Sequence, residues 1–196
     1  MRLITLALGA ALIATAAPAQ AKHHHKAAEA GDGLAGATLL LVRHAEKPES
    51  GQGLTPAGEA RAKAYASYFR HFDVDGKPVR IDAVVATSDT PKSARPRLTV
   101  EPIAQALGLP VQQPFADEDV KGLADWLHAG APRRTVLIAW HHGKLPKLLD
   151  ELKAGCDGVV PDKWPAEVYD WVVVVRYGKD GASKSCKRVE EPNPLS

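Results

Sequence analysis

A short apolar run that breaks off into charged residues constrains the fold of this chain most. Residues 39–42 (Leu-Leu-Leu-Val) have the length of a buried strand, and Arg43 and His44 follow them directly. Open α/β sheets bind their ligands at the carboxyl ends of such strands. An arginine supplies a planar fork of donors there, and a histidine supplies a titratable nitrogen. On its own, however, the Arg-His pair indicates a solvated strand end more readily than a binding site.

Apolar runs alternate with amphipathic helical patterns along the chain. Further strands are predicted at residues 81–86, 135–140 and 172–175, at a short edge starting at Val111, and in a final strand ending near Val189. The predicted helices run from Pro56, capped by Thr55, to about His71, from a Thr99 cap to Gly108, from the acidic residues 117–119 onward, and after residues 141–143. This alternation predicts an α/β fold, a three-layer αβα sandwich with a mainly parallel central sheet.

The first residues are typical of a targeting segment rather than of the fold. Arg2 precedes an apolar run over residues 3–17, and Ala-Gln-Ala at 19–21 matches a signal-peptidase site. We therefore expect residues 1–21 to be a cleaved signal peptide, residues 22–37 a flexible leader and residues 38–196 a single domain that is periplasmic or secreted. An uncleaved anchor is the alternative; otherwise no stable membrane insertion is expected, because no later stretch is long enough to span a bilayer.

Charge and cysteine content narrow the function classes. Removing residues 1–21 takes one arginine and no acid from the net charge of +2 and leaves +1, so nucleic acid is not an expected partner. Cys156 and Cys186 are the two cysteines, and an even pair in an exported chain predicts one disulfide. Two free thiols are the alternative. Neither cysteine follows a predicted strand into a helix, so neither is an expected nucleophile.

Two other sequence patterns are assigned no function. Residues 31–36 match G-x-G-x-x-G but precede a strand, whereas a dinucleotide fingerprint follows one. The run His23–His25 lacks a cysteine or carboxylate at metal-ligand spacing, which favours a solvated polar segment over a metal site.

Cationic residues follow three separate strands at the same predicted edge of the sheet. They are Arg43 with His44 after the first strand, Arg95 in the loop after the second, and His141 after the strand at 135–140. Because three such coincidences are improbable, an anion pocket becomes the better interpretation, and nearby helix N-termini would add backbone N–H groups.

The stretch LVRHAEK resembles the signature of the histidine phosphatase superfamily, also called phosphoglycerate mutase-like. The resemblance continues in the family's order through LTPAGEARA, SARPRLT and TVLIAWHHGKLPKLL, and covers nearly the whole mature chain. It implies a phosphoglycerate mutase-like fold and a phosphomonoesterase of the histidine acid phosphatase type. Such an enzyme acts on a small phosphorylated substrate through a phosphohistidine intermediate, without a metal or other cofactor.

The same resemblance implies a role for each cationic residue. His44 is the nucleophile, Arg43 and Arg95 bind the phosphoryl oxygens from opposite sides, and His141 helps hold the phosphoryl group in the transition state. These roles agree with the chemistry, since a neutral imidazole is a competent nucleophile and two arginines with a second histidine can neutralise the transferred group. We expect the other ring nitrogen of His44 to bond a backbone carbonyl.

Two pairs of neighbours compete for these roles. Arg97 competes with Arg95, but the family's second arginine usually lies four residues before a threonine, and Thr99 favours Arg95. His142 competes with His141, which lies at the family's usual distance from the following helix.

The general acid is the least defined residue. The family often has a glutamate after the edge strand, and Asp117 and Glu118 stand in that region here. Either could protonate an alkoxide leaving group, but capping of the next helix explains the acidic cluster equally well.

The sequence leaves three functions open. A phosphomonoesterase is favoured, and a catalytically weak relative that binds phosphorylated ligands or envelope components is the main alternative. A third possibility is a metal-binding protein using residues 23–25 with His141 and His142. The substrate would be selected by the loops at residues 49–53, 88–95 and 155–166, which the sequence alone does not interpret.

Overall fold

The computed structural model describes residues 33–130 and 134–192. The predicted signal peptide, the His23–His25 run and most of the predicted leader lie outside these residues. The last five residues assigned to the leader, 33–37, form a turn in which Leu34 and Ala37 are buried in the core. The packed domain therefore includes residues before 38.

A six-stranded mixed sheet forms the centre of the protein. Its strand order is β5 (Val111–Gln112), β4 (Ala83–Ala86), β6 (Thr135–Trp140), β1 (Thr38–Arg43), β7 (Trp171–Tyr177) and β8 (Ser183–Glu190). The pairings from β5 to β1 are parallel, whereas β7 is antiparallel to β1 and to β8. A small hairpin consists of β2 (Asp73–Val74) and β3 (Lys77–Pro78). The sheet is thus mainly parallel, as predicted, with an antiparallel edge.

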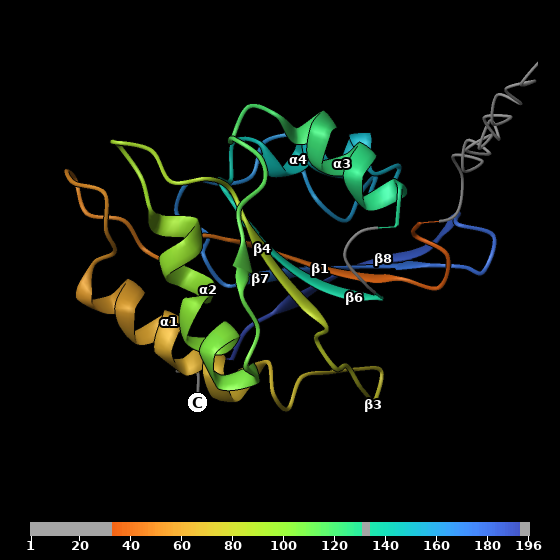
Figure 1. Cartoon of the computed structure of the whole chain (residues 1–196), viewed down its shortest axis with the longest axis horizontal. Coiled ribbons are helices and arrows are strands. Elements are labelled where there is room, and N and C mark those ends of the chain that lie inside the picture. Colours follow the sequence, from red (N-terminus) through yellow and green to blue (C-terminus); the bar gives the residue numbers. More distant parts are fainter. Residues whose placement is uncertain (1–32, 131–133, 193–196) are drawn as a thin grey trace, which may run out of the picture.

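Four helices cover the two faces of the sheet (Figure 1). They are α1 (Pro56–Tyr68), α2 (Arg95–Leu107), α3 (Val120–His128) and α4 (Leu145–Glu151). Leu39 and Leu41 belong to the core cluster that contains α3 and α4, and Leu40 and Val42 to the cluster that contains α1 and α2. Because side chains alternate along a strand, this short apolar run serves both cores, which confirms the three-layer sandwich.

The register of the sheet brings the functional segments together. In the parallel pairing Arg43 lies beside Trp140, and Ala86 lies beside Ala139. The backbone N–H of His44 continues the ladder by donating to the carbonyl of Trp140 at 3.0 Å. Strands β1, β4 and β6 therefore end at one edge, and the residues that follow them meet there.

The helix starts agree with the sequence in two cases. Thr55 caps α1, with Pro56 in its first turn, and its side chain accepts from the N–H of Gly58 at 3.1 Å. Asp119 caps α3 by accepting from the N–H of Gly122 at 2.9 Å.

One helix start was predicted wrongly. Helix α2 begins at Arg95, with Pro96 in the first turn, rather than after a Thr99 cap. The hydroxyl of Thr99 instead donates to the carbonyl of Arg95, one turn earlier in the same helix, at 2.8 Å. Gly108 ends the helix with a left-handed φ of 67°, as expected for a C-terminal glycine. Helix α1 also ends earlier than predicted, at Tyr68 rather than near His71.

A disulfide joins Cys156 to Cys186 and so links the segment after α4 to β8. This confirms the pairing predicted from the cysteine count. Within residues 33–130 and 134–192, none of the helices combines the length and the apolar character that crossing a membrane requires.

Replacing both Cys156 and Cys186 by serine should lower the free energy of unfolding by about 3 to 4 kcal/mol, because the bond closes a loop with a sequence separation of 30 residues in the unfolded chain. Urea unfolding of the oxidised protein and of the double variant measures the difference. Reduced wild type is the control and should show the same loss. A loss below about 1 kcal/mol would contradict the chain-entropy explanation.

Candidate active site

His44 lies buried at the end of β1 and is only 2% exposed. Its Nδ1 is 2.7 Å from the carbonyl oxygen of Ala45. A carbonyl oxygen can only accept, so Nδ1 carries the proton and Nε2 keeps its lone pair. The bond to a backbone carbonyl agrees with the expectation from the sequence. The ring is therefore held with Nε2 as its unprotonated nitrogen.

The surroundings of His44 keep its ring uncharged. Burial lowers the pKa of His44 to about 3, and the charges of His141, Arg43 and Arg95 act in the same direction, while the bond to Ala45 opposes them. The direction follows from the cost of placing a second cation in a buried, already positive site. At neutral pH the imidazole is therefore fully available for attack.

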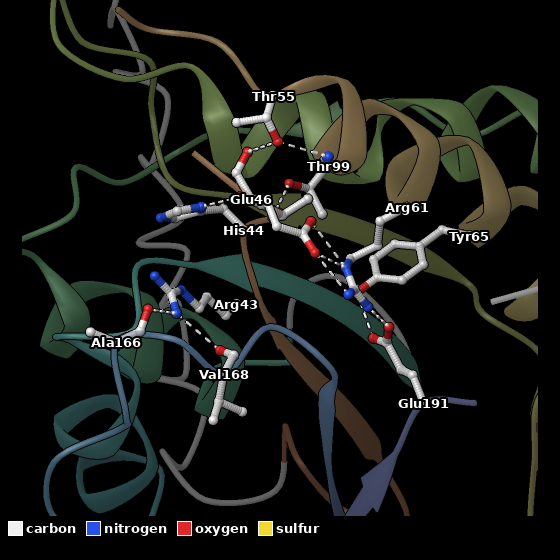
Figure 2. Close-up of polar contacts among 12 residues, drawn as sticks. Arg43, His44, Glu46, Thr55, Arg61, Tyr65, Thr99, Ala166, Val168 and Glu191 are labelled. Atoms are coloured by element: carbon white, nitrogen blue, oxygen red, sulfur yellow. Dashed lines mark hydrogen bonds and ion pairs between the residues drawn. The ribbon is translucent and has the colours of Figure 1, made fainter. Parts of the chain in front are cut away.

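Arg43 is a completely buried cation held by backbone carbonyls (Figure 2). Its Nη1 donates to Ala166 at 2.5 Å and to Val168 at 2.9 Å, and its guanidinium lies 3.7 Å from the centre of the Tyr169 ring. Its Nε and Nη2 are buried without a hydrogen-bond partner among the described residues. Burial lowers the pKa of Arg43, since no carboxylate pairs with it directly. Two unused donors on a buried cation suit an anionic ligand.

Arg95 reaches the same site from the first turn of α2. Its Nη1 donates to the carbonyl of Gly51 at 3.0 Å, and its buried Nε has no partner among the described residues. Burial lowers the pKa of Arg95, and the charge of Arg95 contributes to the low pKa of His44. Arg97, the sequence competitor, instead forms ion pairs with Asp89 at 2.8 Å and Glu101 at 3.1 Å.

An open cavity of about 340 Å³ adjoins Arg95 between residues 47–51 and 91–92. Its lining includes Arg95 but neither His44 nor Arg43. A larger cavity, of about 560 Å³, lies along α4 and residues 153–157 and 160–162 and contains neither His44 nor the two arginines.

His141 packs edge-on against His44, with the ring centres 5.1 Å apart. Its Nδ1 is 2.9 Å from Oδ1 of Asp117, and its Nε2 is 3.0 Å from Oγ of Ser93. Burial lowers the pKa of His142, and the charges of Arg43 and Lys47 act in the same direction. Of the two histidines, the structure brings His141 against the ring of His44.

The two candidate acids have different surroundings. Asp117 contacts His141, and its carbonyl accepts from the indole Nε1 of Trp140 at 3.2 Å. Glu118 is 80% exposed and pairs with Lys144 at 2.6 Å. Because Asp119 caps α3, capping does not explain Asp117, which lies in the site.

The loop after His44 is fastened to both neighbouring helices. The N–H of Ala45 donates to the Thr99 hydroxyl at 2.8 Å, and the Glu46 carbonyl accepts from the N–H of Thr55 at 2.9 Å. A Cβ at Gly58 would lie 2.5 Å from that same carbonyl, so the close approach requires glycine. Residues 54–58 of the LTPAGEARA stretch and Thr99 therefore fix the position of the loop that follows His44.

An ion-pair network of partly buried Glu46 and Arg61 and fully buried Glu191 supports the loop after His44 (Figure 2). Arg61 pairs with Glu46 at 2.8 Å and also with Glu191, and the Tyr65 hydroxyl donates to Glu191 at 2.6 Å. The Glu191 side chain is fully buried, and burial raises its pKa in spite of Tyr65 and Arg61. The network joins the loop, α1 and the residue after β8.

Sequence reasoning missed Ser93, Tyr169, Arg61 and Glu191. Ser93 and Tyr169 lie in loops that carried no interpretable pattern. Arg61 belongs to the LTPAGEARA stretch, and its distance from Glu46 gives no helical signal. Glu191 follows Arg61 by 130 residues, so only the fold places them together.

Acid should destabilise the protein through His44, because the folded-state pKa of about 3 lies below the ordinary value of 6.5. Between these values the unfolded chain binds more protons than the folded chain, so the free energy of unfolding decreases as the pH drops below 6.5. Above pH 6.5 the full contribution of His44 to stability is present. At pH 4.5 the loss is roughly 2 to 3 kcal/mol relative to pH 7. Urea unfolding at the two pH values should show a smaller loss of stability for His44→Gln than for wild type. Equal losses in the two proteins would contradict the attribution of this acid sensitivity to His44.

The sequence and the structure were compared with known proteins. No protein-family model and no curated protein matches the sequence. Three similar solved structures are the protein histidine phosphatase SixA in complex with tungstate, a mycobacterial glucosyl-3-phosphoglycerate phosphatase and a phosphoglycerate mutase from Plasmodium falciparum. Their identities to this chain are 17%, 16% and 12%.

SixA is similar to this chain with a TM-score of 0.52, over 78% of this chain and 96% of SixA. The mycobacterial enzyme has a TM-score of 0.49 over 79% and 97% of the two chains, and the mutase 0.48 over 81% and 91%. At such low identity the similarity establishes the fold. This chain therefore shares its fold with the protein histidine phosphatase SixA.

Proposed function

We propose that this protein is an exported phosphomonoesterase that transfers the phosphoryl group of its substrate to His44 and then to water, without a metal ion. The observation that carries the proposal is the state of His44, a buried neutral imidazole whose Nδ1 is tied to Ala45 and whose Nε2 is free. Two arginines with unused buried donors, Arg43 and Arg95, accompany it. A neutral imidazole beside guanidinium groups that can bind an anion suits a phosphate ester.

In the first half of the reaction, the lone pair on Nε2 of His44 attacks phosphorus. The N–P bond forms as the bond from phosphorus to the leaving oxygen breaks, and the leaving oxygen takes up a proton. Free donors on Arg43 and Arg95 neutralise the charge on the equatorial oxygens. His141 packs against the His44 ring beside them. The bond from Nδ1 to Ala45 stabilises the ring when it becomes cationic.

In the second half, a water molecule attacks the phosphorus of phosphohistidine. The N–P bond breaks, its electron pair returns to Nε2, and the attacking water gives its proton to the group or solvent that had protonated the leaving oxygen. Free phosphate then leaves. The resting tautomer of His44 is restored with no net change in the protein.

The neighbouring structures support the substrate class. SixA binds tungstate in its solved structure, and tungstate, like phosphate, is a tetrahedral oxyanion. The cavity beside Arg95 is open and lined mainly by loop residues, which suits a small phosphorylated substrate. Export is supported by the signal-like residues 1–21 and by the disulfide, since such bonds persist in oxidising compartments.

A protein that only binds phosphorylated ligands or envelope components is the alternative. The same donors on Arg43 and Arg95 would serve it, but a buried nucleophile with a free Nε2 favours catalysis. Purified mature protein that binds phosphate but never releases it from any ester would favour the alternative.

His44→Ala should lower turnover of p-nitrophenyl phosphate by a factor on the order of 10³ or more, because the nucleophile is lost. The same change should abolish an acid-labile phosphoryl label on the protein, detected by mass spectrometry after rapid quenching. Wild type in EDTA is the control and should keep its full rate. Labelling of another residue in wild type would contradict the assignment.

Arg95→Gln and Arg97→Gln form a matched pair of variants. Removing a donor to the transferred group should lower kcat/KM by roughly 10² to 10³-fold for Arg95. The Arg97 variant loses only a partly exposed ion pair and should stay within about twofold of wild type. Steady-state assays with p-nitrophenyl phosphate measure both, and the reverse order would exchange the roles of the two arginines.

A further inference from the structure

Both ring nitrogens of His141 face side chains from other segments. Asp117 comes from the segment before α3, and Ser93 comes from the loop before α2. The distances are 2.9 Å from Nδ1 to the Asp117 carboxylate and 3.0 Å from Nε2 to the Ser93 hydroxyl. An imidazole between a carboxylate and a hydroxyl has its orientation and tautomer determined by them.

Ser93 is rigidly placed for this contact. A tight turn holds it, in which the Thr90 N–H donates to the Ser93 carbonyl at 2.9 Å and the Ser93 N–H donates to the Thr90 hydroxyl at 3.0 Å. The next residue, Ala94, donates to the carbonyl of Gln52 at 3.0 Å. Ser93 is only 5% exposed, so its hydroxyl has little access to solvent. A buried hydroxyl is kept where its hydrogen bonds are satisfied.

The groups that face the two ring nitrogens give the tautomer of His141. The carboxylate of Asp117 can only accept, so the neutral ring carries its proton on Nδ1, the nitrogen that faces Asp117. The Ser93 hydroxyl, which accepts from the backbone N–H of Arg95 at 3.4 Å, can also donate, and it then donates to Nε2. The donors then follow one direction: the Arg95 N–H donates to Ser93, Ser93 donates to His141, and the Nδ1–H of His141 faces Asp117. We call this series of contacts the hydrogen-bond relay.

The contact between Asp117 and His141 is close but not linear. Neither Oδ1 of Asp117 nor Nδ1 of His141 has an aligned hydrogen-bond partner among the described residues, although the two atoms are 2.9 Å apart. Catalytic contacts are often poorly aligned before substrate binds and tighten in the complex. A carboxylate in this place holds the Nδ1–H of His141 and so fixes the orientation of the ring against His44.

We propose that Asp117 and Ser93 are positioning residues that act through His141, and that Asp117 is not the acid that protonates the leaving group. This inference rests on the proposed function. Asp117 and Ser93 keep His141 in one orientation and one tautomer against His44, and the leaving oxygen takes its proton from water. The rate of wild type should then depend steeply on how good the leaving group is.

The first test compares two esters with the same phosphoryl group, p-nitrophenyl phosphate and phenyl phosphate. Asp117→Asn and Ser93→Ala should each lower kcat by roughly ten- to a hundredfold, with KM little changed, because they misplace His141. The factor should be the same for both esters. If Asp117→Asn slowed phenyl phosphate far more than p-nitrophenyl phosphate, Asp117 would be the general acid and the proposal would be overturned.

The second test places each change in a His141→Ala background. Residues that act only through His141 cost nothing further once it is gone, so the losses should not add. Additive losses would overturn the proposal. Glu118→Gln is the matched control, since this neighbouring acid pairs with Lys144 at the surface, and it should leave both rates unchanged. Thermal unfolding confirms that each variant is folded.

A third measurement does not depend on turnover. The ¹⁵N NMR shifts of the His141 ring in wild type should identify Nδ1 as the protonated nitrogen of the neutral ring. Protonation on Nε2 instead would overturn the relay. If wild type hydrolysed neither ester, the proposed function would fail, whereas the tautomer of His141 would still decide the hydrogen-bond relay.

Discussion

The site depends on burying the charge of Arg43 without a carboxylate beside it. Moving a cation out of water costs several kcal/mol unless its donors are satisfied. Here the carbonyls of Ala166 and Val168 and the ring of Tyr169 compensate part of that cost, while Nε and Nη2 remain unpaired among the described residues. In the proposed reaction an arriving dianion completes the set. Burial, together with the charges of His141, Arg43 and Arg95, keeps His44 neutral. The same surroundings would thus serve both binding and attack in that reaction.

The fold supplies the rigidity that such an arrangement needs. Parallel pairing of β1 with β6 places His44 beside Trp140 and hence next to His141. The loop after His44 is then tied to α1 through Thr55 and to α2 through Thr99. These bonds fix the angle of the nucleophile, which in-line attack on phosphorus demands.

Much of this was predictable because it depends on local patterns. The strands follow from apolar runs, and the start of α1 follows from Thr55 and Pro56. The choice of Arg95 over Arg97 came from the family resemblance, through the spacing to Thr99; in the structure Arg97 pairs with Asp89. The start of α2 was not predictable, because the Thr99 hydroxyl has two roles that only the packed structure reveals. The hydroxyl donates to the carbonyl of Arg95 in its own helix and accepts from the N–H of Ala45. A threonine in the sequence indicates a possible helix cap, but the sequence does not reveal that its hydroxyl is used in this other way. Long-range partners such as Ser93 for His141 lie equally beyond a local pattern.

The position of Glu191 shows how far the support of the site extends along the chain. Its carboxylate follows β8, yet it pairs with Arg61, which in turn holds Glu46, two residues after the nucleophile. Cys156 ties the segment that supplies the carbonyls around Arg43 to the same β8. The antiparallel edge of the sheet therefore anchors both sides of the site. Since unpaired buried charge destabilises a fold, the disulfide and the Arg61–Glu191 ion pair at this edge offset part of what the buried charge of Arg43 costs.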